Sequence, residues 1–137
     1  MQNLVTHLFV YGSLRQGFKS DAYQYISQYF TFVANATVAG KLVHNGNYPL
    51  GVTSNNGEKI IGELYCITNT ANYEWAYAQL DDYEGVIVEA NETPAYIKAT
   101  ATAYYNNTEV QCILYWYNGN TDGMAVIPSG DVFDFYK

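Results

Sequence analysis

The chain has 137 residues, of which 49% are apolar and 14% charged, and its net charge is −7. We therefore expect one folded domain over residues 1–137 and exclude a disordered chain, because enough apolar surface can be buried to offset chain entropy. With 13 acidic and 6 basic side chains, the protein would repel a phosphate backbone, so no nucleic-acid partner is expected. The sequence contains neither a leader pattern nor about 18 consecutive apolar residues, which predicts a cytoplasmic location and no membrane partner.

The N-terminal part of the chain predicts a strand, a loop and a helix. Residues 4–11 are mostly β-branched, aromatic or otherwise apolar, and the break at Gly12 places a loop at the carboxyl end of a strand. A Ser-Asp pair then offers an N-cap, and apolar residues recur at helical spacing after it. This pattern predicts an amphipathic helix over about residues 21–30.

The middle of the chain is rich in β signals. Residues 31–43 have a β pattern in which Gly40 indicates a bulge or a close backbone approach. An Asn-Gly-Asn turn separates this segment from a short strand near Tyr48. Residues 59–67 predict a strong strand with one acidic residue among apolar neighbours, Glu63, which faces either water or a site.

The C-terminal half predicts a helix and a hairpin. An apolar stripe followed by Gly85 predicts a helix over about residues 71–83. Residues 96–105 and 110–117, joined by an Asn-Asn turn, predict a β-hairpin, and residues 127–137 a closing turn. These elements sum to an α+β domain: a strongly curled sheet or small mixed β-barrel of about six strands, flanked by two main helices.

Three carboxylates fall at the end of the second predicted helix, where the helix dipole disfavours negative charge: Asp81, Asp82 and Glu84. The dipole and like-charged neighbours would raise a carboxyl pKa toward the range useful for proton transfer. Glu84, next to Gly85, is the best-placed candidate. The alternative is that all three acids are solvated in a frayed last turn and contribute only solubility.

The loop Tyr11-Gly12-Ser13-Leu14 is either an ordinary turn or a nest of backbone N–H groups that binds a carboxylate or an oxyanion. A hydrolase nucleophile at Ser13 is disfavoured, because the surrounding residues lack a Gly-x-Ser-x-Gly elbow. Among the fifteen tyrosines, Tyr11, Tyr115 and Tyr117 are the first candidates for lining a pocket and hydrogen-bonding a ligand.

The cysteines and histidines carry no recognisable chemistry. Both cysteines lie in apolar, strand-like runs, which is typical of buried thiols. The four residues match no zinc spacing, so we expect no metal site from them: His7, His44, Cys66 and Cys112.

Four segments, in this order, resemble the gamma-glutamyl cyclotransferase-like family. Phe9–Gly17 is similar to the family's N-terminal signature, and Tyr48-Pro49-Leu50 to its short Tyr-Pro segment. Leu80–Gly85 is similar to its Leu-Asp-x-x-Glu-Gly motif, and Ile127–Asp131 to its closing segment. The family fold is a small mixed β-barrel flanked by helices, in agreement with the elements predicted above.

The resemblance implies an enzyme that releases 5-oxoproline and a free amine from a gamma-glutamyl amine or amide. The Tyr11–Leu14 loop would hold the glutamyl group through backbone N–H groups, and Glu84 would be the general acid/base. Tyr117, singled out above among the tyrosines, is expected to contact the substrate as well. The expected partner is this small molecule, and no metal or organic cofactor is required. The alternative is a small-molecule binding module of the same fold that catalyses nothing.

One departure from the family pattern is visible. Many relatives have an aromatic-x-Arg stretch after the acidic motif, whereas this chain has Tyr96-Ile97-Lys98. A bidentate arginine contact would become a point-charge contact at Lys98, which affects substrate identity more than reaction type.

Overall fold

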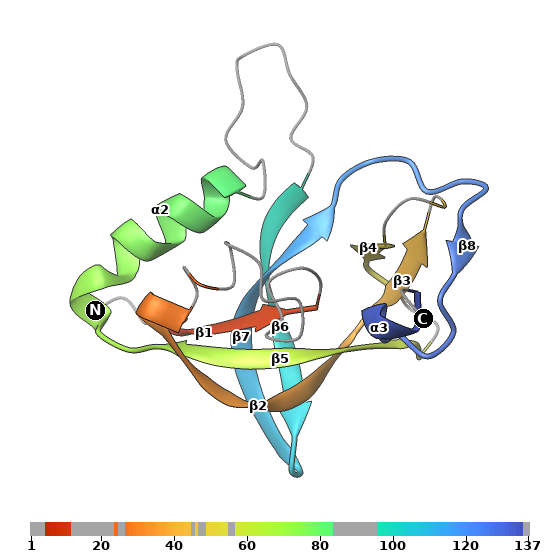
Figure 1. Ribbon diagram of the computed structural model, residues 1–137. Helices are drawn as coiled ribbons and strands as arrows, with labels where there is room; N and C mark the ends of the chain where they lie inside the picture. The colour runs from red at the N-terminus through yellow and green to blue at the C-terminus, as the bar shows by residue number, and fades with distance from the viewer. Residues whose placement is uncertain are drawn as a thin grey trace.

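A closed barrel and a smaller sheet organise the chain. The computed structural model describes residues 5–11, 24, 27–44, 46, 49–54, 57–83 and 96–135. Neighbouring strands in the barrel follow the order β1 (His7–Val10), β5 (Lys59–Ile67), β2 (Phe30–Ala39), β6 (Tyr96–Tyr105) and β7 (Thr108–Tyr117). Beside it lies a sheet of β4 (Pro49–Val52), β3 (Lys41–His44) and β8 (Ala125–Val126) (Figure 1). The predicted small mixed β-barrel is thereby confirmed.

Helix α2 (Tyr73–Tyr83) lies across one face of the barrel (Figure 1). One turn of 3-10 helix, η2 (Thr70–Asn72), precedes it, and the Asn69 side chain caps that turn by accepting a hydrogen bond from the Ala71 N–H at 2.9 Å. The helix predicted over about residues 71–83 is confirmed. No helix in the described ranges is long and apolar enough to cross a membrane.

The other predicted helix ends earlier than its periodicity indicated. Gln24 and Ser27–Tyr29 are helical, but Phe30, predicted as helical, is the first residue of β2. The Phe30 ring is buried and meets the Tyr77 ring of α2 edge-on, with centroids 5.5 Å apart. Burial beneath α2 therefore decides the conformation of this residue. At the other end of the chain, Val132–Phe135 form a short helix, α3, where a closing turn was predicted.

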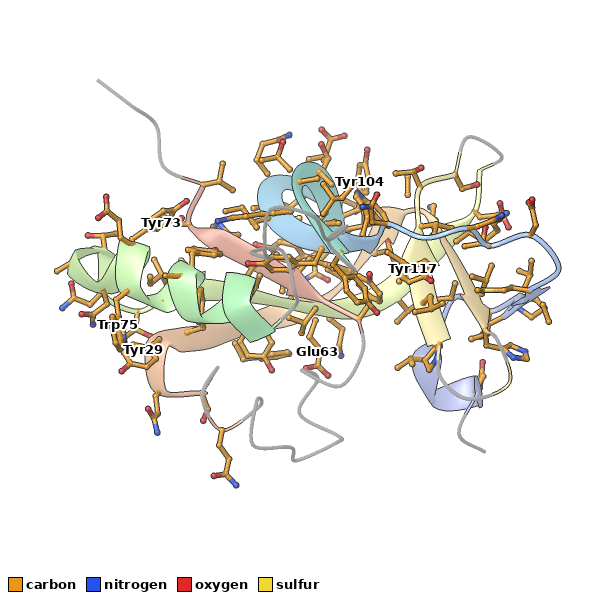
Figure 2. The ribbon with its side chains drawn as sticks, turned by 90° about the horizontal axis from the view of Figure 1, so that it is seen from above. Tyr29, Glu63, Tyr73, Trp75, Tyr104 and Tyr117 are labelled. Carbon is orange, nitrogen blue, oxygen red and sulfur yellow. The ribbon has the colours of Figure 1, made fainter. Side chains whose placement is uncertain are left out.

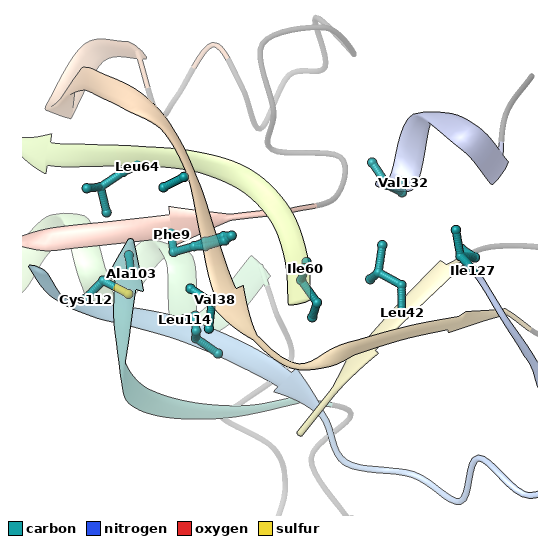
Figure 3. Close-up of a cluster of buried hydrophobic side chains, with 11 residues drawn as sticks. Phe9, Val38, Leu42, Ile60, Leu64, Ala103, Cys112, Leu114, Ile127 and Val132 are labelled. Atoms are coloured by element: carbon teal, nitrogen blue, oxygen red, sulfur yellow. The ribbon is translucent and has the colours of Figure 1, made fainter. Parts of the chain in front are cut away.

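Strand β1 is buried on both of its faces. Leu8 and Val10 belong to a cluster with Leu80 of α2, whereas Phe9 points the other way into the barrel. Figure 3 shows Phe9 among the interior side chains, with Leu42 farther along the same cluster. This double burial agrees with the apolar sequence of β1, whose last three residues are all buried.

Glycine and asparagine stand at two junctions between consecutive strands. Gly40 separates β2 from β3, so the strand predicted over residues 31–43 is divided there. A Cβ on Gly40 would lie 2.8 Å from Cη2 of Trp116, which confirms the predicted close approach. Between β6 and β7, Asn106 and Asn107 both have positive φ, 48° and 62°, and form the tight turn of the predicted hairpin.

The hairpin turn generates a stability prediction. Because Asn107 has a left-handed backbone, Asn107→Val should lower the free energy of unfolding by about 1–2 kcal/mol, the cost of a Cβ-branched residue in that region. Asn107→Gly, which tolerates positive φ, should be neutral or stabilising. Urea denaturation of both variants checks this, and equal stability of the two would contradict the turn assignment.

Candidate functional site

The two segments that carry the candidate motifs leave the same buried cluster. Val10, the last residue of β1, packs in one cluster with Leu80 in the last turn of α2 and with Tyr115 of β7. The sequence continues directly from β1 into Tyr11 and from α2 into Glu84. Of the predicted site, four residues lie outside the described ones, namely Gly12, Ser13, Leu14 and Glu84.

Tyr11 is described, and its side chain is engaged with the barrel. Its hydroxyl donates a hydrogen bond to the backbone carbonyl of Tyr115. Its ring lies 6.2 Å from that of Phe9 and 6.5 Å from that of Trp116, between centroids. The structure therefore brings Tyr11 and Tyr115 together, two of the tyrosines singled out from the sequence. The contact is made by the backbone carbonyl of Tyr115, not by its side chain.

Glu63 is the one buried charged residue in the described part of the chain, at 2% exposure. It stands in register with Val10 of β1 and Asn35 of β2, and its Oε1 accepts a hydrogen bond of 2.9 Å from the Tyr65 hydroxyl. A buried carboxylate is tolerated only when such donors replace water. The sequence left open whether Glu63 faces water or a site, and its burial shows that the orientation toward water is wrong.

Figure 2 shows Glu63 and Tyr117 toward the end of α2 at which Tyr83 lies, whereas Tyr73 and Trp75 lie at its other end. Glu63 therefore belongs to the same end of the barrel as the start of the predicted loop. The sequence signal for it was an acid inside an otherwise apolar strand.

Tyr117, the remaining candidate substrate contact, closes β7 and is half-buried. Its ring packs edge-on against Tyr96, with centroids 5.8 Å apart, where β6 begins. Its hydroxyl lies so close to Gly119 that a Cβ at that position would collide with it. Packing against Tyr96 and Gly119 thus fixes the direction of the Tyr117 ring.

Lys98, at the position where relatives often have arginine, contacts the helix. Its Nζ lies 5.0 Å from the ring centroid of Tyr77, within cation–π range. The Tyr77 hydroxyl in turn donates to the His7 carbonyl oxygen at 3.4 Å. Lys98 therefore connects the barrel to α2, a contact that sequence reasoning missed because it depends on where α2 packs.

A histidine and the two cysteines form a row across three strands. His7 is in register with Cys66 of β5 on one side and with Cys112 of β7 on the other. Burial lowers the pKa of His7, and it raises the pKa of the Cys112 thiol to about 12, only partly opposed by a hydrogen bond with the Ala101 backbone. Both thiols are free, and the described residues contain no group of three side chains able to hold a metal. The thiol of Cys112 is fully buried as predicted, whereas Cys66 is only half-buried.

These features define a class of small β-barrel proteins with a helix across one barrel face. Protein PH0828 from Pyrococcus horikoshii has this fold, with 17% identity, a TM-score of 0.66, and coverage of 96% of this chain and 92% of that one. The Escherichia coli protein ytfP matches with 24% identity and a TM-score of 0.60, covering 96% and 99% of the two chains. An AIG2-like mouse protein matches with 20% identity and a TM-score of 0.59, covering 88% and 92%. Identities this low establish the fold alone.

The family is established by sequence. The model of the family described as gamma-glutamyl cyclotransferase, AIG2-like, matches residues 8–134, so the chain belongs to this family. No curated protein matches the chain significantly. The matched range includes the Tyr11–Leu14 loop and Glu84.

The hydrogen bond between Tyr65 and Glu63 generates a second prediction. Tyr65→Phe removes a donor from a buried carboxylate and should lower the free energy of unfolding by about 1.5–3 kcal/mol, measured by urea denaturation. Tyr104→Phe is the matched control, because Tyr104 is 43% exposed and its loss should leave stability unchanged. Equal effects of the two substitutions would show that the Tyr65 hydrogen bond contributes nothing.

Cys112 generates a third prediction. Its folded-state pKa of about 12 lies above the unfolded value near 9, so its contribution to stability is complete below pH 9 and is lost as pH rises from 9 toward 12. In a Cys66→Ser background the native protein should therefore resist iodoacetamide at pH 8.5, and the thiol should react only after unfolding. Rapid labelling of the native variant, followed by mass spectrometry, would contradict this.

Proposed function

We propose that the protein is a gamma-glutamyl cyclotransferase that converts a gamma-glutamyl amine or amide into 5-oxoproline and a free amine. The observation that carries the proposal is the family match over residues 8–134, which contains the loop and Glu84 in the expected order. The membership of Val10 and Leu80 in one buried cluster supports it, because the chain runs from that cluster into both motifs.

The proposed reaction needs a base and an acid. The substrate's α-ammonium is no nucleophile, so the Glu84 carboxylate accepts a proton from it. The neutral amine attacks the γ-carbonyl carbon, and a five-membered ring forms through a new C–N bond. Glu84 then gives this proton to the departing amine as the bond between that amine and the γ-carbon breaks. The ring nitrogen loses its remaining extra proton, which the freed amine takes up to leave as an ammonium ion. One molecule of substrate gives 5-oxoproline and amine, without water or cofactor.

Binding of the substrate falls to the Tyr11–Leu14 loop in this proposal. The α-carboxylate and the oxyanion that develops on the γ-carbonyl both need fixed donors, and backbone N–H groups supply them without a buried cation. Because the attack is intramolecular, holding the folded-back conformer is a large part of the catalytic task, about 7–11 kcal/mol in favourable systems. The Tyr117 ring, already oriented by Tyr96, is a further proposed wall of the site.

Replacement of Glu84 tests the acid/base assignment. Glu84→Gln should lower kcat for 5-oxoproline release by about 100- to 10,000-fold, the usual contribution of a general acid/base, and leave folding and ligand binding intact. Glu74→Gln removes a negative charge from the exposed first turn of α2, at the other end of the helix, and serves as the matched control, with kcat close to that of the parent protein. Undiminished turnover by Glu84→Gln would overturn the assignment.

A panel of gamma-glutamyl amines, gamma-glutamyl amino acids and glutathione identifies the leaving group in the same assay. The non-catalytic alternative makes a distinct prediction, namely binding of a gamma-glutamyl compound by the parent protein with no release of 5-oxoproline. A glutamate at position 84 disfavours that alternative, because a negative charge opposes simple binding of an anionic ligand.

A further inference from the structure

The Tyr-Pro segment of the sequence has no part in the reaction proposed above, yet the structure places its continuation against Tyr11, the first residue of the candidate loop. Pro49–Val52 form β4, which pairs with β3 and lies against β7. Within β4, Gly51 is buried and stands in register with Leu42. The strand thus brings a residue without a side chain to the end of the barrel where Tyr11 lies.

The Tyr11 ring occupies the space that a side chain at position 51 would need. A Cβ built on Gly51 would lie 2.5 Å from Cε2 and Cζ of Tyr11 and 2.6 Å from its hydroxyl oxygen. Real Cβ atoms essentially never approach other atoms so closely, so the ring rests directly on the Gly51 backbone. No positive φ is recorded for Gly51, so close approach is the physical reason for glycine here.

Other contacts complete the enclosure of this ring. The Tyr115 carbonyl oxygen accepts a hydrogen bond from the Tyr11 hydroxyl. The rings of Phe9 and Trp116 flank the Tyr11 ring, with their centroids 6.2 and 6.5 Å from its own. The ring is therefore held by β4 and by the end of β7. The Tyr11 hydroxyl, which was predicted from the sequence to contact a ligand, already donates its hydrogen bond to the Tyr115 carbonyl oxygen.

We propose that Gly51 and the Tyr115 carbonyl form a clamp on Tyr11, and that the Tyr11 side chain is a positioning residue rather than a substrate ligand. The clamp holds the Tyr11 ring, and the chain continues from Tyr11 into the residues whose backbone N–H groups are assigned to the substrate. Its catalytic consequence rests on the proposed cyclotransferase function. Misplacement of such groups by about 1 Å can cost roughly 100-fold in rate.

Gly51→Ala is the direct test, because its methyl group must push the Tyr11 ring aside. We expect KM for an active gamma-glutamyl substrate to rise and kcat/KM to fall by about 10- to 100-fold in a protein that still folds. In a Tyr11→Leu background the methyl group has no ring to displace, so Gly51→Ala should add less than about twofold. Equal effects of Gly51→Ala in the two backgrounds, or an unchanged KM, would overturn the clamp.

Val132→Ala is the control for general destabilisation. Val132 is buried beside Leu42 and Ile127, away from Phe9 in the same cluster (Figure 3). Its truncation should lower the melting temperature without raising KM. A rise in KM that simply follows melting temperature across Val132→Ala and Gly51→Ala would count against a specific clamp.

A second measurement separates failure of the clamp from failure of the proposed function. Hydrogen exchange followed by mass spectrometry should show faster exchange of peptides covering residues 9–17 in Gly51→Ala and Tyr11→Leu, and unchanged exchange there in Val132→Ala. This result needs no turnover, so it supports the clamp even if no gamma-glutamyl substrate is found. Unchanged exchange in Gly51→Ala would overturn the clamp even if Glu84 proves catalytic.

Discussion

Closure of the barrel through β1 is the constraint on which the rest of the structure depends. β1 pairs antiparallel with β5 on one side and parallel with β7 on the other, so four residues complete the ring of strands. Closure leaves no free edge in the barrel and buries β1 on both faces. At the point where the chain leaves β1, ahead of Tyr11, Val10 is still in register with Glu63 of β5, whereas the pairing with β7 covers only His7 and Leu8.

Elements with strong local signals could be predicted from the sequence. The Asn-Asn turn accepts positive φ at both positions, and the two β runs beside it pair along their whole length, so neighbouring residues determine the hairpin. Helix α2 has its own apolar stripe and a capped entry at Asn69. By contrast, Phe30 fits a helical period and yet belongs to β2, because its ring is buried against Tyr77, a residue far away in the sequence.

The candidate site was only partly accessible to the same reasoning. Glu63 stood out as an acid in an apolar strand, but its orientation depends on a closed barrel with buried faces, which no local pattern encodes. Nothing in the sequence around Gly51 indicates that the Tyr11 ring lies on it, because that contact is made between the second sheet and the barrel. Similarly, the motif order indicates Glu84 and the loop, whereas the contacts of Lys98 and Tyr117 follow from the packing of α2 and β6.

The negative charge of the protein explains why the positions of hydrogen-bond donors should matter more for substrate binding than long-range electrostatic attraction. A chain with net charge −7 gains nothing from long-range fields when its proposed substrate carries a carboxylate. At this end of the barrel, Glu63 adds a buried carboxylate that accepts a hydrogen bond from Tyr65. In the proposed site, the glutamyl group is bound by the dipoles of backbone N–H groups, whose strength depends on direction as well as distance. Such dipoles need a fixed backbone. The pairing of β1 and the contact of Gly51 with Tyr11 hold the residues from which the chain enters the loop, whereas the net charge of the protein cannot attract an anionic substrate.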